Sequence, residues 1–174
     1  PAINIHRTPL CGRNFEYYSE DPLVAGEMAA AMVEGIQSEG VGASLKHFAC
    51  NNKETNRKDC DSRLSERALR EIYLKGFELC VKKAQPLTVM SSYNLVNGLW
   101  ASQNRELLTD ILRGEWGFKG MVTTDWYTHA PQYTEIAAGN DVKMGCGDAA
   151  HTLRMMREGK LKREDVAISV RRLL

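Results

Sequence analysis

Residues 87–125 read LTVMSSYNLVNGLWASQNRELLTDILRGEWGFKGMVTTD and contain the pattern that decides the fold class. The stretch begins with a short apolar run of strand length, LTVMSS, and ends with a second one, MVTTD. Between them, leucine and isoleucine recur with the 3.6-residue period of a helix, which Gly117 closes. A strand, a helix and a second strand in this order are typical of an α/β protein with a parallel sheet.

The same alternation continues in both directions along the chain. Further apolar runs of strand length lie at 2–5, 43–48 and 141–144. Further helical patterns cover 22–36, 69–84, 131–138 and 148–158, and a last one that begins near 163 is still running at Leu174. The strand runs are apolar on both faces, as expected for strands that helices cover on each side. The sequence therefore predicts one α/β domain of about five strand–helix units.

Two architectures fit about five strand–helix units. A closed (β/α)8 barrel takes about 250 residues, so 174 residues would form either a small doubly wound sheet or part of a barrel. The sequence begins on a strand and ends inside a helical pattern, and neither end resembles the edge of a finished sheet. We expect a partial (β/α)8 TIM-type barrel with a parallel sheet, a single and incomplete domain over 1–174. Its unpaired edges would promote self-association.

Composition narrows the range of partners. The 23 basic and 22 acidic side chains give a formal net charge of +1, which creates no broad positive field for nucleic acid or anionic lipid. No stretch approaches the roughly 18 uncharged apolar residues that a membrane span needs. We therefore expect neither nucleic acid nor a membrane as a partner.

The five cysteines are widely scattered and contain no CxxC pair. This pattern favours reduced thiols over a disulfide framework or a metal site. The first residues lack the layout of a signal peptide. Together these observations favour a cytoplasmic location.

Polar side chains of catalytic type follow the apolar runs at their carboxyl ends. Lys46 and His47 end one run, Tyr93 follows the next, and Asp125 and Trp126 follow the third. Ligands bind at this end of the strands in barrels and in open parallel sheets. Each residue also has an ordinary structural explanation, but an ionised carboxylate at the end of a buried strand is costly unless it is paired or functional. Asp125 is therefore the strongest candidate for a reactive group.

These side chains suit a neutral polyhydroxylated ligand. Cations donate charge-assisted hydrogen bonds to sugar hydroxyls, and an indole offers a flat apolar face to a pyranose. The sequence has no GxGxxG after a strand, no GxxxxGK[ST], no HExxH and no GxSxG, so nucleotide, zinc-protease and serine-hydrolase chemistry lose their main support. A non-catalytic carbohydrate-binding or scaffold module and a small doubly wound domain that binds a phosphorylated ligand stay open.

Seven stretches, taken in order, carry a resemblance to a known family. They read PLCGRNFEYYSEDP, KHF followed by NNKETNR, SERALREIYLKGF, VMSSYNLVNG, LLTDILRGEWGFKG, VTTDW and AAGNDVKMG. In this order they resemble the catalytic barrel of glycoside hydrolase family 3, of the β-glucosidase type, through essentially the whole chain. The resemblance implies a retaining, exo-acting β-glycosidase that needs no metal or organic cofactor. Its partner would be a small β-glucoside or oligosaccharide, and a β-xylosidase is the alternative specificity.

The resemblance also implies a role for each matched polar residue. Asp125, in TDW, would be the nucleophile that forms a covalent glycosyl-enzyme intermediate. The side chains that would surround the terminal sugar are Arg13, Lys46, His47, Arg57, Tyr93 and Trp126. The family takes its glutamate acid/base from a separate α/β sandwich domain, and no glutamate of this chain matches that position. Without a proton donor, only substrates with good leaving groups should react readily.

Overall fold

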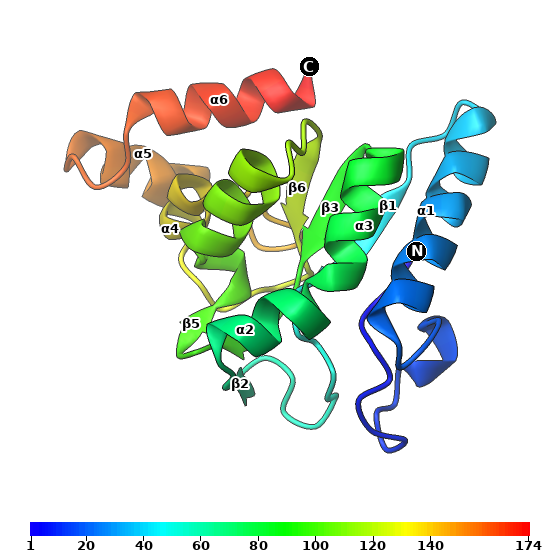
Figure 1. Ribbon diagram of the computed structural model, residues 1–174. Helices are drawn as coiled ribbons and strands as arrows, with labels where there is room; N and C mark the ends of the chain where they lie inside the picture. Colours follow the sequence, from blue (N-terminus) through cyan, green and yellow to red (C-terminus); the bar gives the residue numbers. More distant parts are fainter.

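Three strands form the central parallel sheet of the computed structural model, which describes residues 1–174 (Figure 1). They are β1 (Ser44–Phe48), β3 (Thr88–Ser91) and β6 (Met121–Thr124), in the spatial order β1-β3-β6. Each neighbouring pair is parallel. Isolated parallel bridges extend the sheet on both sides, from Ala2 to Lys46 and from Val142 to Thr123. All five predicted runs therefore lie side by side in chain order.

The predicted α/β class and parallel sheet are confirmed. The runs at 2–5 and 141–144 differ from the expectation, because each contributes a single bridge rather than a full strand. The pairings follow one another in a row and form no closed ring. The partial barrel therefore stays a prediction at this point.

Helices follow the strands and lie in two groups (Figure 1). Helices α1 (Pro22–Ser38) and α3 (Lys75–Ala84) pack together, whereas α4 (Gln132–Ala138) contacts α5 (Ala149–Arg157) and α6 (Arg163–Leu173). The remaining helical segments are η1 (Asn14–Glu16), α2 (Glu66–Ala68), η2 (Leu69–Tyr73), η3 (Ala101–Gln103) and η4 (Glu106–Glu115), of which η2 and η4 have π-type hydrogen bonding. The helix predicted over 69–84 is thus a composite of η2 and α3. None of the helices is both long and apolar enough to cross a lipid bilayer.

Helix α1 shows how local sequence signals set the ends of an element. Asp21 caps its N-terminus by accepting hydrogen bonds from the backbone N–H of Leu23, at 2.7 Å, and of Val24. Pro22 occupies the first turn, where its missing N–H costs nothing. Beyond the helix, Gly40 has a φ of +75° and ends the helical path.

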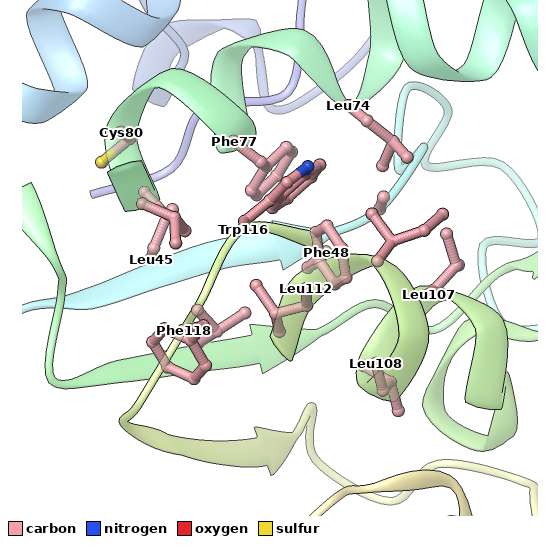
Figure 2. Packing of buried hydrophobic residues seen from close by; sticks show 14 of the residues in the cluster. Leu45, Phe48, Leu74, Phe77, Cys80, Leu107, Leu108, Leu112, Trp116 and Phe118 are labelled. Atoms are coloured by element: carbon pink, nitrogen blue, oxygen red, sulfur yellow. The ribbon is translucent and has the colours of Figure 1, made fainter. Parts of the chain in front are cut away.

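The core lies between the sheet and the helices that cover it (Figure 2). Phe48 of β1 packs edge-on against Phe77 of α3, with ring centroids 5.2 Å apart, and against Trp116, at 5.8 Å. Leu112 of η4 and Leu45 of β1 are fully buried beside them. This packing fixes the strands, and therefore the residues that follow them.

A second, small sheet joins the loops that follow β1 and β3. It consists of β2 (Asp61–Ser62), β4 (Leu95–Val96) and β5 (Leu99–Trp100), in the order β2-β4-β5. The hairpin from β4 to β5 turns at Asn97 and Gly98, whose φ angles of 51° and 88° are typical of a type I′ turn. This sheet braces two loops at the same end of the molecule.

Candidate active site

The polar residues that follow the central strands meet at one edge of the sheet. Lys46 and His47 lie in β1, Tyr93 comes two residues after β3, and Asp125 directly follows β6. The strands are parallel and adjacent, so their carboxyl ends share an edge. The backbone N–H of Asp125 donates to the carbonyl of Ser91 at 3.2 Å, which continues the pairing of β6 with β3 up to this edge.

Asp125 is a buried carboxylate with one oxygen free of hydrogen bonds. Its Oδ1 accepts the backbone N–H of Trp126 at 2.7 Å, whereas its buried Oδ2 has no hydrogen-bond partner. Nε2 of His47 lies 3.9 Å from Oδ2. An unpartnered oxygen on a residue only 6% exposed is expensive to keep for stability alone. The arrangement fits a group that is held ready for a reaction.

His47 is fully buried, and Asn4 holds its backbone. The Asn4 side chain donates to the carbonyl of His47 and accepts from its N–H, both at 3.0 Å. Burial, together with the positive charges of Arg13, Lys46 and Arg57, lowers the pKa of His47 to about 2. The imidazole is therefore neutral, and its contact with Asp125 is not an ion pair. Asn4 was not among the predicted site residues. The only feature of the sequence that points to its role is its position as a polar residue inside the apolar run at 2–5.

The buried imidazole makes stability depend on pH. An unfolded chain protonates His47 near its ordinary pKa of 6.5, whereas the folded chain resists protonation down to about 2. Between these values the unfolded state binds more protons, so the histidine stabilises the fold above pH 6.5 and that contribution falls as the pH drops. We expect the free energy of unfolding to fall by about 1.4 kcal/mol per pH unit below pH 6.5 from this residue.

Urea unfolding between pH 7 and pH 5 measures this slope. Over this range a His47→Gln variant should lose about 2 kcal/mol less stability than the wild type, because the full slope is reached only well below pH 6.5. Equal slopes in the two proteins would contradict a neutral buried imidazole.

Two of the predicted cations share one acidic partner. Glu16 forms an ion pair with Arg13, and its Oε2 lies 3.2 Å from Nζ of Lys46. Burial disfavours the charge of Glu16, but the hydrogen bonds from Arg13 and Lys46 outweigh burial and lower the pKa of its carboxyl. Glu16 had no predicted role, although its place three residues after Arg13 is a usual spacing for a local ion pair. In the structure, Glu16 holds both Arg13 and Lys46 in place.

Arg57 and Tyr93 form a third contact beside Asp125. The guanidinium carbon of Arg57 lies 4.7 Å from the centre of the Tyr93 ring, a cation–π distance. Glu54 accepts a hydrogen bond of 2.9 Å from Nη1 of Arg57 and so orients it. Burial and the negative charge of Asp125 raise the pKa of Tyr93 to about 12, so its hydroxyl keeps its proton. Tyr93 is a permanent donor next to the carboxylate.

Trp126 extends the site toward solvent. Its side chain is about half exposed and lies beside Tyr127, with ring centroids 6.0 Å apart. A Cβ at position 145 would lie 2.9 Å from both rings, so Gly145 is required for the chain to approach them. The indole is therefore no part of the core, and one face can meet a ligand.

All seven predicted residues thus belong to one connected cluster. Its members are Arg13, Lys46, His47, Arg57, Tyr93, Asp125 and Trp126. None of them lines the largest hollow of the molecule, about 570 Å³ between α4, α5 and α6. No three His, Cys, Asp or Glu side chains are placed to hold a metal ion, and all five cysteines are free. The cluster can offer a nucleophile, fixed hydrogen-bond donors and an aromatic face.

Fold and site together define an α/β protein with a cluster of enzyme-type polar side chains, centred on a carboxylate, at the carboxyl edge of a parallel sheet. Residues 1–174 match the family described as the glycosyl hydrolase family 3 N-terminal domain. The chain belongs to this family. The membership predicted from the seven ordered stretches is confirmed.

Individual relatives agree with this assignment. The chain is 58% identical over 166 residues to beta-glucosidase A of Butyrivibrio fibrisolvens, which covers 95% of the chain and 20% of that protein. It is 56% identical over 144 residues to an exo-alpha-(1->6)-L-arabinopyranosidase of Bifidobacterium longum, covering 83% of the chain and 19% of that protein. Beta-glucosidase 3B of Thermotoga neapolitana, solved in complex with alpha-D-glucose, superposes with a TM-score of 0.96 at 51% identity. That match covers 99% of this chain and 26% of the solved one.

Proposed function

We propose that the protein containing this chain is a retaining, exo-acting β-glucosidase, with Asp125 as its nucleophile. The observation that carries the proposal is the buried carboxylate of Asp125, whose Oδ2 lacks a hydrogen-bond partner and lies 3.9 Å from Nε2 of the neutral His47. The protonated Tyr93 also lies near this carboxylate. The β-glucosidases among the relatives support the same reading.

The proposed reaction proceeds in two displacements. An Asp125 oxygen forms a bond to the anomeric carbon while the glycosidic C–O bond breaks, and the leaving oxygen takes a proton from an acid. In the second displacement the deprotonated acid accepts a proton from water as the water oxygen bonds to the same carbon. The ester bond to Asp125 breaks, so its carboxylate and the acid are both regenerated and the sugar keeps its original configuration. We propose that the acid is a glutamate of a sandwich domain outside residues 1–174.

The other cluster residues would bind the terminal sugar. Arg13 and Lys46, both fixed by Glu16, would donate charge-assisted hydrogen bonds to its hydroxyls. His47 is neutral and rigid, so it would add a hydrogen bond that does not change with pH. Trp126 would stack on the apolar face of the ring.

We further propose that the sheet is part of a (β/α)8 barrel. Its pairings are parallel and in chain order, as barrel strands are. Val24, Met28 and Met32 leave an apolar stripe on the outer face of α1, which supports the expected self-association of the chain alone. Sedimentation velocity tests that point, since Met28→Lys combined with Met32→Lys should shift the chain toward monomer.

Trapping the intermediate tests the nucleophile. An activated 2-fluoro-β-glucoside needs no acid for its first step, and its fluorine slows the second, so the glycosyl group accumulates on the nucleophile. Peptide mass spectrometry of the labelled chain should place the adduct on Asp125. A folded chain that binds glucoside without an adduct would favour a non-catalytic carbohydrate-binding module instead.

A pentopyranoside is the second candidate substrate. The relative from Bifidobacterium longum is nearly as similar to this chain as beta-glucosidase A, and its name specifies an α-L-arabinopyranoside. Such sugars, and β-xylosides, lack the C6 hydroxymethyl group of glucose. Comparison of kcat/KM for the 4-nitrophenyl glycosides of the three sugars should favour β-glucoside by about tenfold or more. A preference for the arabinoside would select the second candidate.

A further inference from the structure

Lys58 contacts all three loops that form the candidate site. It belongs to the loop after β1, next to Arg57. Its Nζ donates a hydrogen bond of 3.1 Å to the carbonyl of Tyr127, in the loop after β6. The same ammonium lies 5.2 Å from the centre of the Tyr93 ring, after β3. A charged residue in this polar loop would ordinarily be a solvated surface group, but this one has partners on both neighbouring loops.

The backbone of Lys58 is also hydrogen-bonded to another element. Its carbonyl accepts the indole N–H of Trp100, in β5, at 3.0 Å. The next residue, Asp59, lies 3.1 Å from Nδ1 of His129, whose ring also packs edge-on against Trp100. The contact between Asp59 and His129 is half exposed and adds little by itself. It does show that the loops after β1 and β6 are in contact at two successive positions.

The residue that Lys58 holds has an unusual backbone. Tyr127 has a φ of 56°, in the left-handed region that a bulky side chain rarely adopts. Its N–H donates to the carbonyl of Met144 at 3.1 Å, and its carbonyl accepts from Lys58. A strained residue persists only where its surroundings fix it. Two residues earlier in the same loop lies Asp125, and Trp126 lies between them.

We propose that Lys58 is a positioning residue, which fixes the loop carrying Asp125 and Trp126 against Tyr93 and Arg57. The inference rests on the proposed glycosidase function for its kinetic consequence, though its structural consequence is independent of it. Lys58 does not touch the sugar in this proposal. By holding the loop, Lys58 keeps the Asp125 carboxylate in position to attack the anomeric carbon. A small displacement of a nucleophile slows its attack more than it weakens substrate binding.

Lys58→Met removes the ammonium and keeps most of the stem. Hydrogen exchange of peptides that cover 125–131 should become about tenfold faster, as expected for loss of a charge-assisted hydrogen bond. The maximal rate of labelling by the 2-fluoroglucoside should fall by about tenfold, while its half-saturating concentration stays within about twofold. Lys58→Arg can still reach the Tyr127 carbonyl and should restore both quantities.

Lys53→Met is the matched control, since Lys53 is an exposed lysine of the same loop. It should change neither measurement, and circular dichroism should show all variants folded. Wild-type labelling and wild-type exchange in Lys58→Met would overturn the inference and leave the proposed function intact. Failure of the wild-type enzyme that contains this chain to label at all would count against the proposed function, and the exchange measurement would still decide the role of Lys58. Faster exchange that Lys58→Arg does not restore would also overturn the positioning role.

Discussion

Replacement of Asp125 by asparagine should slow hydrolysis of aryl β-glucosides by the enzyme that contains this chain by about 10⁴-fold or more. Asparagine keeps the shape of the side chain, and its oxygen can still accept the Trp126 N–H that Oδ1 now accepts. It cannot form the glycosyl ester, so the first displacement loses its nucleophile. Steady-state kinetics with a 2,4-dinitrophenyl glucoside measures the loss, because the good leaving group reduces the need for an acid.

The same substitution should leave stability unchanged or raise it by about 1 kcal/mol. The wild-type protein keeps a buried carboxylate oxygen without a partner, and a neutral amide is cheaper to bury. Asp21→Asn is the matched control. Asparagine caps a helix as well as aspartate does, and position 21 lies at the start of α1, away from the site. It should alter neither rate nor stability. An active Asp125→Asn variant would mean that the nucleophile lies elsewhere.

The second large effect concerns a buried ion pair beneath the loop after β6. Lys143 donates to Glu135 at 2.8 Å, and the same ammonium donates to the carbonyls of Thr128, at 3.2 Å, and Ala130, at 2.8 Å. Both charged side chains are almost completely buried. Lys143→Met would leave the Glu135 charge without its partner, so we expect the free energy of unfolding to fall by about 3–5 kcal/mol. Urea unfolding at pH 7 measures it.

Two variants separate lost charge pairing from lost packing. The double variant Lys143→Met with Glu135→Met removes both charges and should recover most of the loss. Lys83→Met breaks the half-exposed pair with Glu27 and should cost less than about 1 kcal/mol. A Lys143→Met variant as stable as Lys83→Met would show that the buried pair contributes nothing.

Local patterns in the sequence predicted the elements of the sheet and their helices. Helix α1 and the strands β1, β3 and β6 follow from hydrophobic period and caps, because each depends on residues close together in the chain. The π-type hydrogen bonding of η2 and η4 does not follow, because it leaves the apolar period almost unchanged. The turn at Asn97 and Gly98 has a clear hairpin signal, yet its strands are too short to show alternation.

The candidate site was predicted less completely, for a physical reason. The residues that match the family stretches were found, and they lie together. Their supports were missed, because Asn4 with His47, Lys143 with Glu135, and Lys58 with Tyr127 are contacts between different elements or loops. Hydrophobic periodicity reflects residues that are close together in the chain, so it does not reveal contacts between distant residues. The ammonium of Lys143, inside a run read only as a strand, contacts three residues of the preceding loop and helix.

The chain-order arrangement of the sheet has a consequence for synthesis of the protein. Every strand pairs with the strand one unit before or after it in the chain. Each pairing therefore closes a loop of one unit only, and the entropy lost at each closure is small. A nascent chain could add strands one at a time as the ribosome releases them, without waiting for distant segments. The carboxylate of Asp125 would then join side chains of the earlier units, such as His47 and Tyr93, that were already in place.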